Sequence, residues 1–447
     1  MAAPDADSRG IMRSRVVAWA LWDCGSTGLN AIVATFVFSV YLTSTVGVGL
    51  PGPTTPASWL GRAGALAGLT VALLAPAVGV WVESAHRRRV ALGVLTALAI
   101  TLTCSMFFIR DRPGYLWAGL VLLAATAACG DLASVPYNAM LRQLSTPQTA
   151  GRISGFGWAA GYAGSVLLLI LVYSGFISGS GSGPDAVRGL LRVPVHDGLY
   201  VREAMLAAAA WLAVLALPLL LVSHRFSDDG LELDAAYQPT SMLGGYRRLW
   251  TEIKDQWRRD RNLVYFLGAS ALFRDGLAAI FAFGAVIGVN AYGLTQGDVL
   301  IFGVAASVVA ALGAVLGGFV DQRIGSKPVI VGSLTAIVTS ALTLMTLSGP
   351  VAFWVCGLLL CLFIGPSQSS SRALLLRMAH DGKEGVAFGL YTMTGRAVAF
   401  VAPWLFSLFV DMFGAVRAGL GGVCLVLAVG LLAMVGVRVP TLDAARR

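Results

Sequence analysis

Residues 79–89, GVWVESAHRRR, end an apolar run of the sequence, Leu60–Val82, that is long enough to cross a lipid bilayer. A related stretch at residues 317–327, GGFVDQRIGSK, ends a second such run, Val299–Val320. In both stretches a glycine is followed four residues later by an acid and then by basic residues. Two copies of one pattern, far apart in the chain, predict a membrane protein built from two related halves.

Apolar runs of membrane-spanning length recur along the whole chain. A transmembrane helix needs about 20 mostly apolar residues. Twelve runs meet that length: Val16–Leu42, Leu60–Val82, Val90–Ile109, Tyr115–Leu141, Ile153–Phe176, Glu203–Val222, Leu263–Val289, Val299–Val320, Pro328–Leu347, Val351–Met378, Val386–Val410 and Arg417–Val437. The sequence therefore predicts an all-α integral membrane protein with twelve transmembrane helices.

The composition excludes a soluble protein of this size. Of the 447 residues, 57% are hydrophobic and only 12% are charged, and the mean hydropathy is +0.77. Soluble domains are about 45–50% apolar and about 25% charged. The net charge of +9 is explained mainly by membrane topology, because most of the 32 lysines and arginines fall on one side of the predicted membrane. That asymmetry predicts a multi-pass protein of the plasma (inner) membrane with both termini in the cytoplasm, and it leaves no reason to expect a nucleic-acid partner.

One long polar stretch divides the twelve runs into six and six. We expect residues 1–223 to form an N-terminal six-helix bundle and residues 263–447 to form a C-terminal one. The linker at 224–262 carries aromatic and apolar residues at helical spacing among arginines and lysines, which favours a helix on the inner membrane surface. A solvated linker helix is the alternative.

Six motifs in order resemble one branch of a known superfamily. They are WALWD at 19–23, PYNAML at 136–141, GWAAGY at 157–162, FRDG at 273–276, GPSQ at 365–368 with Ser371-Arg372, and FGLY at 388–391 with Gly395-Arg396. Together with the stretch at 79–89, they resemble the "unknown major facilitator" family of the major facilitator superfamily, related to autophagy-related vacuolar amino-acid effluxers. The pattern departs at His86, where glycine is usual. The resemblance implies two pseudo-symmetric six-helix bundles and transport, with helices 1, 4, 7 and 10 lining a central path.

Ionisable residues inside the spans are the candidates for a solute path. Each costs roughly 2.5–3.5 kcal/mol at the bilayer centre on insertion scales, so we expect them to face one another or a wet cavity. With polar neighbours at helical spacing, the predicted substrate or proton pathway comprises Asp23, Thr27, Asn30, Asp131, Tyr137, Asn138, Arg274, Asp275, Gln368, Arg372, Tyr391 and Arg396.

The signs of these charges indicate a class of solute. The N-terminal half supplies carboxylates and the C-terminal half supplies guanidinium groups, so an ammonium and a carboxylate on one solute can bridge them. Arg372 or Arg396 is the expected grip on the carboxylate. Asp23 and Asp131 are candidates for proton coupling. Asp275 has two open interpretations, a functional one and a structural pair with Arg372 or Arg396.

The repeated glycine–acid pattern predicts a cytoplasmic gate. Charges at helix ends can pair when that side is closed and separate when it opens. The gate residues expected are Gly79, Glu83, Arg87, Arg88, Gly317, Asp321 and Arg323. Anchoring by positive charge alone is the alternative for the arginines.

The function predicted is secondary active transport of a small polar solute, such as an amino acid, a short peptide or a similar zwitterion or anion, with protons as a candidate coupling ion. The alternatives are a multidrug or lipid effluxer and a non-transporting membrane receptor or scaffold. No catalytic constellation, metal-ligand spacing or cofactor motif is present in the sequence, so we expect no enzyme activity, no metal and no cofactor. The expected partners are the solute and the lipid bilayer, and the expected state is a monomer.

Overall fold

Helices make up nearly all of the computed structural model, which describes residues 6–48, 56–179, 186–222, 261–380 and 382–439. The helices of the first half are α1 (Ala6–Asn30), α2 (Phe38–Tyr41), α3 (Pro56–Trp81), α4 (Ala85–Ser105), α5 (Leu116–Ala139), α6 (Leu141–Leu144), α7 (Ala150–Val172) and α8 (Leu199–Val222). Those of the second half are α11 (Arg261–Tyr292), α12 (Gln296–Ile324), α13 (Ser326–Thr346), α14 (Pro350–Met378), α15 (Glu384–Ala397), α16 (Val401–Phe413) and α17 (Val416–Gly436). The predicted linker helix lies outside the described residues.

The prediction of twelve spans is confirmed. Among the described residues, twelve helical segments are long and apolar enough to cross a membrane, and each overlaps one of the predicted runs. The first is interrupted by π-helical turns, η1 (Ala31–Phe36) and η2 (Leu42–Val46). A short antiparallel pair, β1 (Val187–Arg188) with β2 (Val193–Pro194), lies in the loop before α8.

The predicted span Val386–Val410 is confirmed as the membrane-length segment Glu384–Phe413, but this segment contains a break. The eleventh span consists of two half-helices, α15 and α16, separated by a turn at residues 398–400. Pro403 lies in the first turn of α16 and has no N–H to donate to the carbonyl of Ala399, one turn earlier, so one helical hydrogen bond is lost at this point.

Contacts divide the chain into two compact units. The first comprises residues 1–71, 85–137 and 160–229, and the second comprises 72–84, 138–159 and 230–447. The segments 72–84 and 138–159 come from the first half of the sequence and pack with the helices of the second half. The division into bundles 1–223 and 263–447 stays a prediction.

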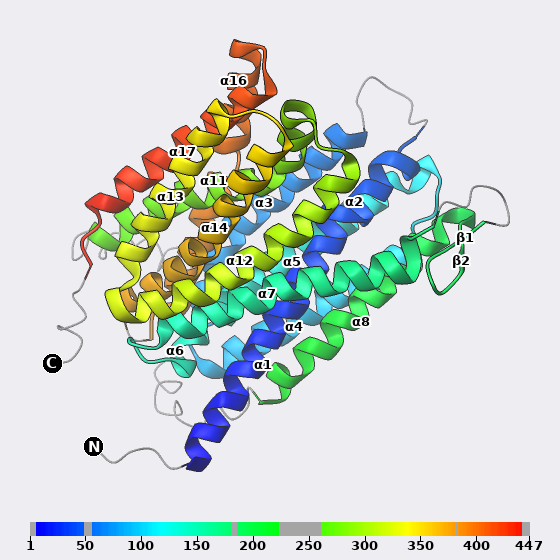
Figure 1. Ribbon diagram of the computed structural model, residues 1–447. Coiled ribbons are helices and arrows are strands. Elements are labelled where there is room, and N and C mark those ends of the chain that lie inside the picture. The colour runs from blue at the N-terminus through cyan, green and yellow to red at the C-terminus, as the bar shows by residue number, and fades with distance from the viewer. Residues whose placement is uncertain (1–5, 49–55, 180–185, 223–260, 381, 440–447) are drawn as a thin grey trace. The chain divides into compact units, whose positions relative to one another are not determined.

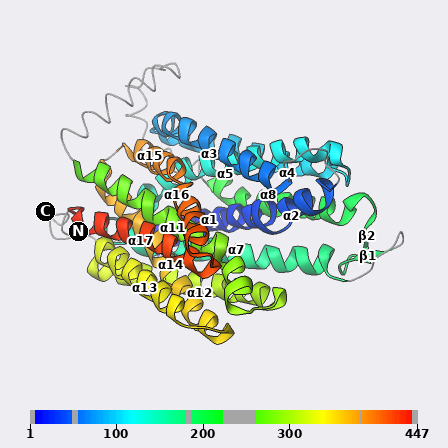
Figure 2. The ribbon, with the colours of Figure 1, turned by 90° about the horizontal axis from the view of Figure 1, so that it is seen from above.

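Each unit has its own helix packing. In the first, α8 packs against both α1 and α4 (Figure 1). In the second, α14 packs against both α12 and α13, and α17 lies along α11 (Figure 2). Glycines permit the closest approaches: a Cβ on Gly317 of α12 would lie 2.5 Å from the Cβ of Pro366 on α14. Small residues at such contacts are typical of membrane helices.

Candidate functional site

The first polar cluster lies on α1 in the first unit, around Asp23. Tyr137 of α5 donates its hydroxyl to Oδ2 of Asp23 at 3.1 Å, and Thr27 donates to Oδ1 at 3.1 Å. The helical spacing of four residues brings Thr27 next to Asp23, as the sequence predicts. Gly161 of α7 lies close by, and a Cβ there would come within 2.9 Å of the Thr27 hydroxyl. Both carboxylate oxygens of Asp23 therefore accept a hydrogen bond, which fixes the orientation of the carboxylate.

Two tryptophans of the WALWD motif fix the ring of Tyr137. Trp19 stacks on it with ring centroids 4.5 Å apart, and Trp22 stacks with centroids 4.4 Å apart. Trp19 also donates its indole N–H to the Tyr137 carbonyl at 3.0 Å, and Trp22 donates to Thr96 of α4 at 3.1 Å. A stacked aromatic ring loses little entropy on binding, because it is already held in place. The WALWD motif therefore supplies Asp23 and also the two indole rings that hold the Tyr137 hydroxyl toward Asp23.

The second polar cluster centres on Arg372 of α14, which is buried in the second unit. Its Nε donates to the Ser154 hydroxyl at 2.9 Å, and its Nη2 donates to the Ser154 carbonyl at 2.8 Å. Its Nη1 donates to the Asn138 amide oxygen at 3.0 Å. Asn138 ends α5 and Ser154 begins α7, so Arg372 ties α14 to two segments of the first half of the sequence.

The third cluster surrounds the break in the eleventh span. Asp275 of α11 is buried and accepts a hydrogen bond from the backbone N–H of Ala402 at 2.7 Å. The partner that the structure gives Asp275 is thus a backbone N–H, whereas the sequence leaves open a pair with Arg372 or Arg396. Arg274 lies 3.7 Å from the centroid of the Tyr391 ring and donates to the Tyr391 carbonyl at 2.9 Å. The Tyr391 hydroxyl shares a hydrogen bond of 2.8 Å with Ser371, which precedes Arg372.

The remaining predicted path residues are placed as follows. Arg396 is exposed at the end of α15 and Asn30 is exposed at the end of α1, whereas Asp131 and Gln368 are half-buried. Among the described residues, no group of three or more histidine, cysteine or acidic side chains could hold a metal ion.

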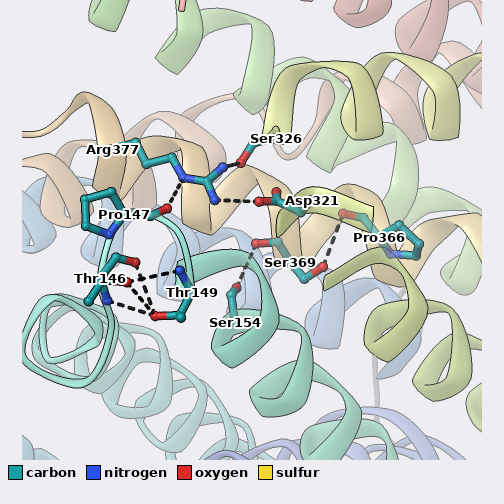
Figure 3. Close-up of polar contacts among 9 residues, drawn as sticks. All are labelled: Thr146, Pro147, Thr149, Ser154, Asp321, Ser326, Pro366, Ser369 and Arg377. Carbon is teal, nitrogen blue, oxygen red and sulfur yellow. Dashed lines mark hydrogen bonds and ion pairs between the residues drawn. The ribbon is translucent and has the colours of Figure 1, made fainter. Parts of the chain in front are cut away.

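A cluster of ion pairs lies at one end of the second unit. Arg377, at the end of α14, lies 2.6 Å from Asp321, whose side chain is fully buried. Arg377 also donates to the Pro147 carbonyl at 2.9 Å and to the Ser326 hydroxyl, as Figure 3 shows. Close by, Ser154 donates to the Ser369 carbonyl at 2.7 Å. Arg377 thus joins α12 and α14 to the loop before α7.

Two further ion pairs link the two halves of the sequence. Lys383 lies 3.3 Å from Glu83, and Arg142 lies 3.8 Å from the buried Glu384. A Cβ on Gly79 would lie 2.5 Å from the Gly385 carbonyl, so glycine is needed where α3 meets α15. We call the three ion pairs Arg377–Asp321, Lys383–Glu83 and Arg142–Glu384 the end cluster.

The structure separates the predicted gate residues. Glu83 and Asp321 both pair with basic residues, whereas Arg323 is exposed and Arg88 is buried on α4 in the first unit, and the gate itself stays a prediction. Arg142, Arg377, Lys383 and Glu384 were not predicted as gate residues. In the sequence, Arg142, Arg377 and Lys383 are explained by positive charge that anchors loops at the membrane surface. Their positions in the sequence therefore did not indicate their ion-pair partners.

Comparisons with known proteins agree with this geometry. The family model described as "Vacuole effluxer Atg22 like" matches residues 56–442. Comparison with curated protein sequences gives no match.

Solved structures share the fold at low sequence identity. The major facilitator superfamily proton:xylose symporter XylE is 15% identical with a TM-score of 0.71, covering 98% of this chain and 99% of its own. The fucose transporter FucP in its outward conformation is 15% identical, with a TM-score of 0.65 and coverage of 96% and 100%. A bacterial homologue of the iron transporter ferroportin in its outward-facing state is 16% identical, with a TM-score of 0.65 and coverage of 95% and 99%.

These likenesses establish the fold as that of the major facilitator superfamily. Within the described residues, the chain is a multi-pass membrane protein with twelve spans. With its family model covering most of the sequence, the chain belongs to the Atg22-like vacuole effluxer family.

Proposed function

We propose that this transporter carries a small zwitterionic or anionic solute, such as an amino acid or a short peptide, across the plasma membrane by alternating access. The observation that supports the solute class best is the Asp23 cluster. A carboxylate whose two oxygens already accept bonds from Tyr137 and Thr27 is held in one orientation, ready to receive an ammonium group.

A guanidinium group on the second unit would bind the carboxylate of the solute. Arg372 donates from all three nitrogens to Asn138 and Ser154, so using it as the grip would require those bonds to break. Arg396 is exposed at the end of α15. Arg372 is therefore proposed as a tie between helices in this state, and Arg396 is the second candidate for the grip.

Proton coupling is proposed on Asp23. Among the structural neighbours, XylE is a proton:xylose symporter and FucP is a fucose:proton symporter. A carboxylate that binds a proton in one state and a cationic group in the other can couple the two movements. Export is the direction favoured by the description of the family as effluxers.

The end cluster is proposed to be the closed cytoplasmic gate. Its ion pairs Glu83–Lys383 and Arg142–Glu384 join segments from the two halves of the sequence, so opening on this side requires both to separate. Both termini are proposed to lie in the cytoplasm and the protein to work as a monomer.

A ligand screen by thermal unfolding tests the proposed solute class. A solute that binds only the folded protein raises its unfolding temperature. We expect amino acids or short peptides to stabilise the purified protein, and the shift to be lost in Asp23→Asn and Arg396→Ala. The matched controls are Asp111→Asn and Arg112→Ala, which change exposed loop residues outside the clusters.

The same screen separates the alternatives. Stabilisation only by amphipathic drugs or lipids, undiminished in Asp23→Asn, would support a multidrug or lipid effluxer. No stabilisation by any solute class, together with no solute movement in vesicles, would support a receptor or scaffold.

A further inference from the structure

The break in the eleventh span lies beside two adjacent residues of opposite charge, Arg274 and Asp275. Arg274 contacts α15 through the ring and the carbonyl of Tyr391, and Asp275 contacts α16 through the N–H of Ala402. We propose that these two residues of α11 hold the eleventh span as two half-helices and thereby position Tyr391 and Arg396. The proposal does not depend on which solute is carried.

The backbone bonds at the break explain why Asp275 is needed. In a continuous helix the N–H of Ala402 would bond the carbonyl of Val398, but here it bonds Asp275. The next residue, Pro403, has no N–H, and the N–H of Val401 bonds Val398 three residues back instead of four. The helical bonds of Val401, Ala402 and Pro403 to the residues four positions back are therefore all missing, and Asp275 supplies the partner of the Ala402 N–H. A buried N–H without a partner is costly in a membrane interior.

The two charges also match the dipoles of the two half-helices. A helix carries partial positive charge at its N-terminus and partial negative charge at its C-terminus. Asp275 lies at the N-terminus of α16, and Arg274 lies against the last two turns of α15. Reversing the two residues would place the wrong sign at each end.

Glycine in the motif Gly395-Arg396 has a physical reason in this arrangement. A Cβ on Gly395 would lie 3.0 Å from Nη1 of Arg274 and 3.2 Å from its Cζ. A side chain at this position would make the guanidinium shift by a few tenths of an ångström against the Tyr391 ring. Arg274, Gly395 and Tyr391 therefore form one contact, which fixes the end of α15 that bears Arg396.

A double-mutant cycle on the full-length protein tests the role of Asp275. The variants are Asp275→Ala, Pro403→Ala and both together, and the measurements are backbone hydrogen exchange over residues 398–404 and the unfolding temperature. With Pro403 present, Asp275→Ala should speed exchange of the Ala402 amide about tenfold or more, the factor expected for loss of a charge-assisted hydrogen bond. With Pro403→Ala, the helix can close its own bonds, so Asp275→Ala should change exchange and unfolding temperature far less.

The cycle distinguishes positioning from packing. If Asp275 only filled space, its replacement would have the same effect in both backgrounds, because independent effects add. Equal effects in the two backgrounds, or unchanged exchange in Asp275→Ala, would overturn the proposal. Asp275→Asn keeps an acceptor oxygen without the charge and should fall between the wild type and Asp275→Ala.

Exchange of the α15 residues tests the role of Arg274. Gly395→Ala should raise exchange over residues 391–397, as Arg274→Ala does, and combining the two should add little further. The control Gly268→Ala changes a glycine of α11 that has no neighbour within 4 Å, and it should leave residues 391–397 unchanged. Additive effects of Arg274→Ala and Gly395→Ala would contradict the contact that the proposal requires.

Discussion

Tyr137 donates its hydroxyl to Asp23 from between two stacked indole rings, those of Trp19 and Trp22. The bond joins α5 to α1 within the first unit, and the stack fixes the direction of the hydroxyl. The orientation of the Asp23 carboxylate is thus set by side chains from two helices, Thr27 of α1 and Tyr137 of α5. This relationship motivates the first prediction.

Tyr137→Phe should keep the stack and remove only the hydroxyl that orients Asp23. Because a single hydrogen bond contributes about 1 kcal/mol, we expect affinity for the solute found in the screen to fall roughly fivefold, with little change in unfolding temperature. Isothermal titration of the purified variant measures the affinity. Tyr173→Phe is the matched control, since Tyr173 is 49% exposed and should be silent. An unaltered affinity in Tyr137→Phe would remove Tyr137 from the site.

Asp321→Asn should destabilise the protein strongly. Breaking a buried ion pair by removing one partner costs about 3–5 kcal/mol, because the other charge is left buried without a counter-charge. The unfolding temperature in detergent should therefore fall in Asp321→Asn and in Arg377→Met, and the double variant should lose less than the sum of the two. Arg323→Met, two residues from Asp321 and exposed, is the control. Strict additivity of the two single changes would show that the pair makes no net contribution.

Arg372→Lys should loosen the tie between α14 and the segments at Asn138 and Ser154. Lysine keeps the positive charge but cannot present three fixed donors to two residues. We expect a loss of about 2 kcal/mol, and we expect Ser154→Ala to cost much less once Arg372 is already lysine. Denaturant titration of the two single variants and the double variant measures this coupling. Equal costs of Ser154→Ala in both backgrounds would mean that the two residues do not act together.

Gly79→Leu should block closure of the end cluster without preventing folding. A side chain at this position would meet the Gly385 backbone, so α3 could not approach α15. Transport should fall at least tenfold while the protein still inserts and purifies, since the free-energy cost of overpacking is about 1–3 kcal/mol. Gly64→Leu lies on the same helix, where a Cβ meets nothing within 4 Å, and should transport normally. Normal transport by Gly79→Leu would show that this approach is not part of the cycle.

Hydropathy predicted the twelve spans because the bilayer imposes one length on every helix that crosses it. The path residues were predicted because an ionisable side chain inside a span costs free energy unless it has a polar partner. The helical spacing of Asp23 and Thr27 predicted the hydrogen bond between them. The partners of Asp275 and Arg377 could not be predicted in the same way, because backbone groups of Ala402 and Pro147 carry no sequence signal. The break before Pro403 was missed because apolar periodicity continues through it, although the proline itself was a local indication.

Solute exchange in reconstituted vesicles tests the central claim most directly. Vesicles containing the protein are loaded with the unlabelled amino acid or peptide that gives the largest thermal shift, and entry of the labelled solute is followed. The account predicts saturable entry that requires the internal solute, is absent from protein-free vesicles, and is lost in Asp23→Asn but kept in Asp111→Asn. Entry at the wild-type rate in Asp23→Asn, or no entry of any solute that stabilises the protein, would contradict it.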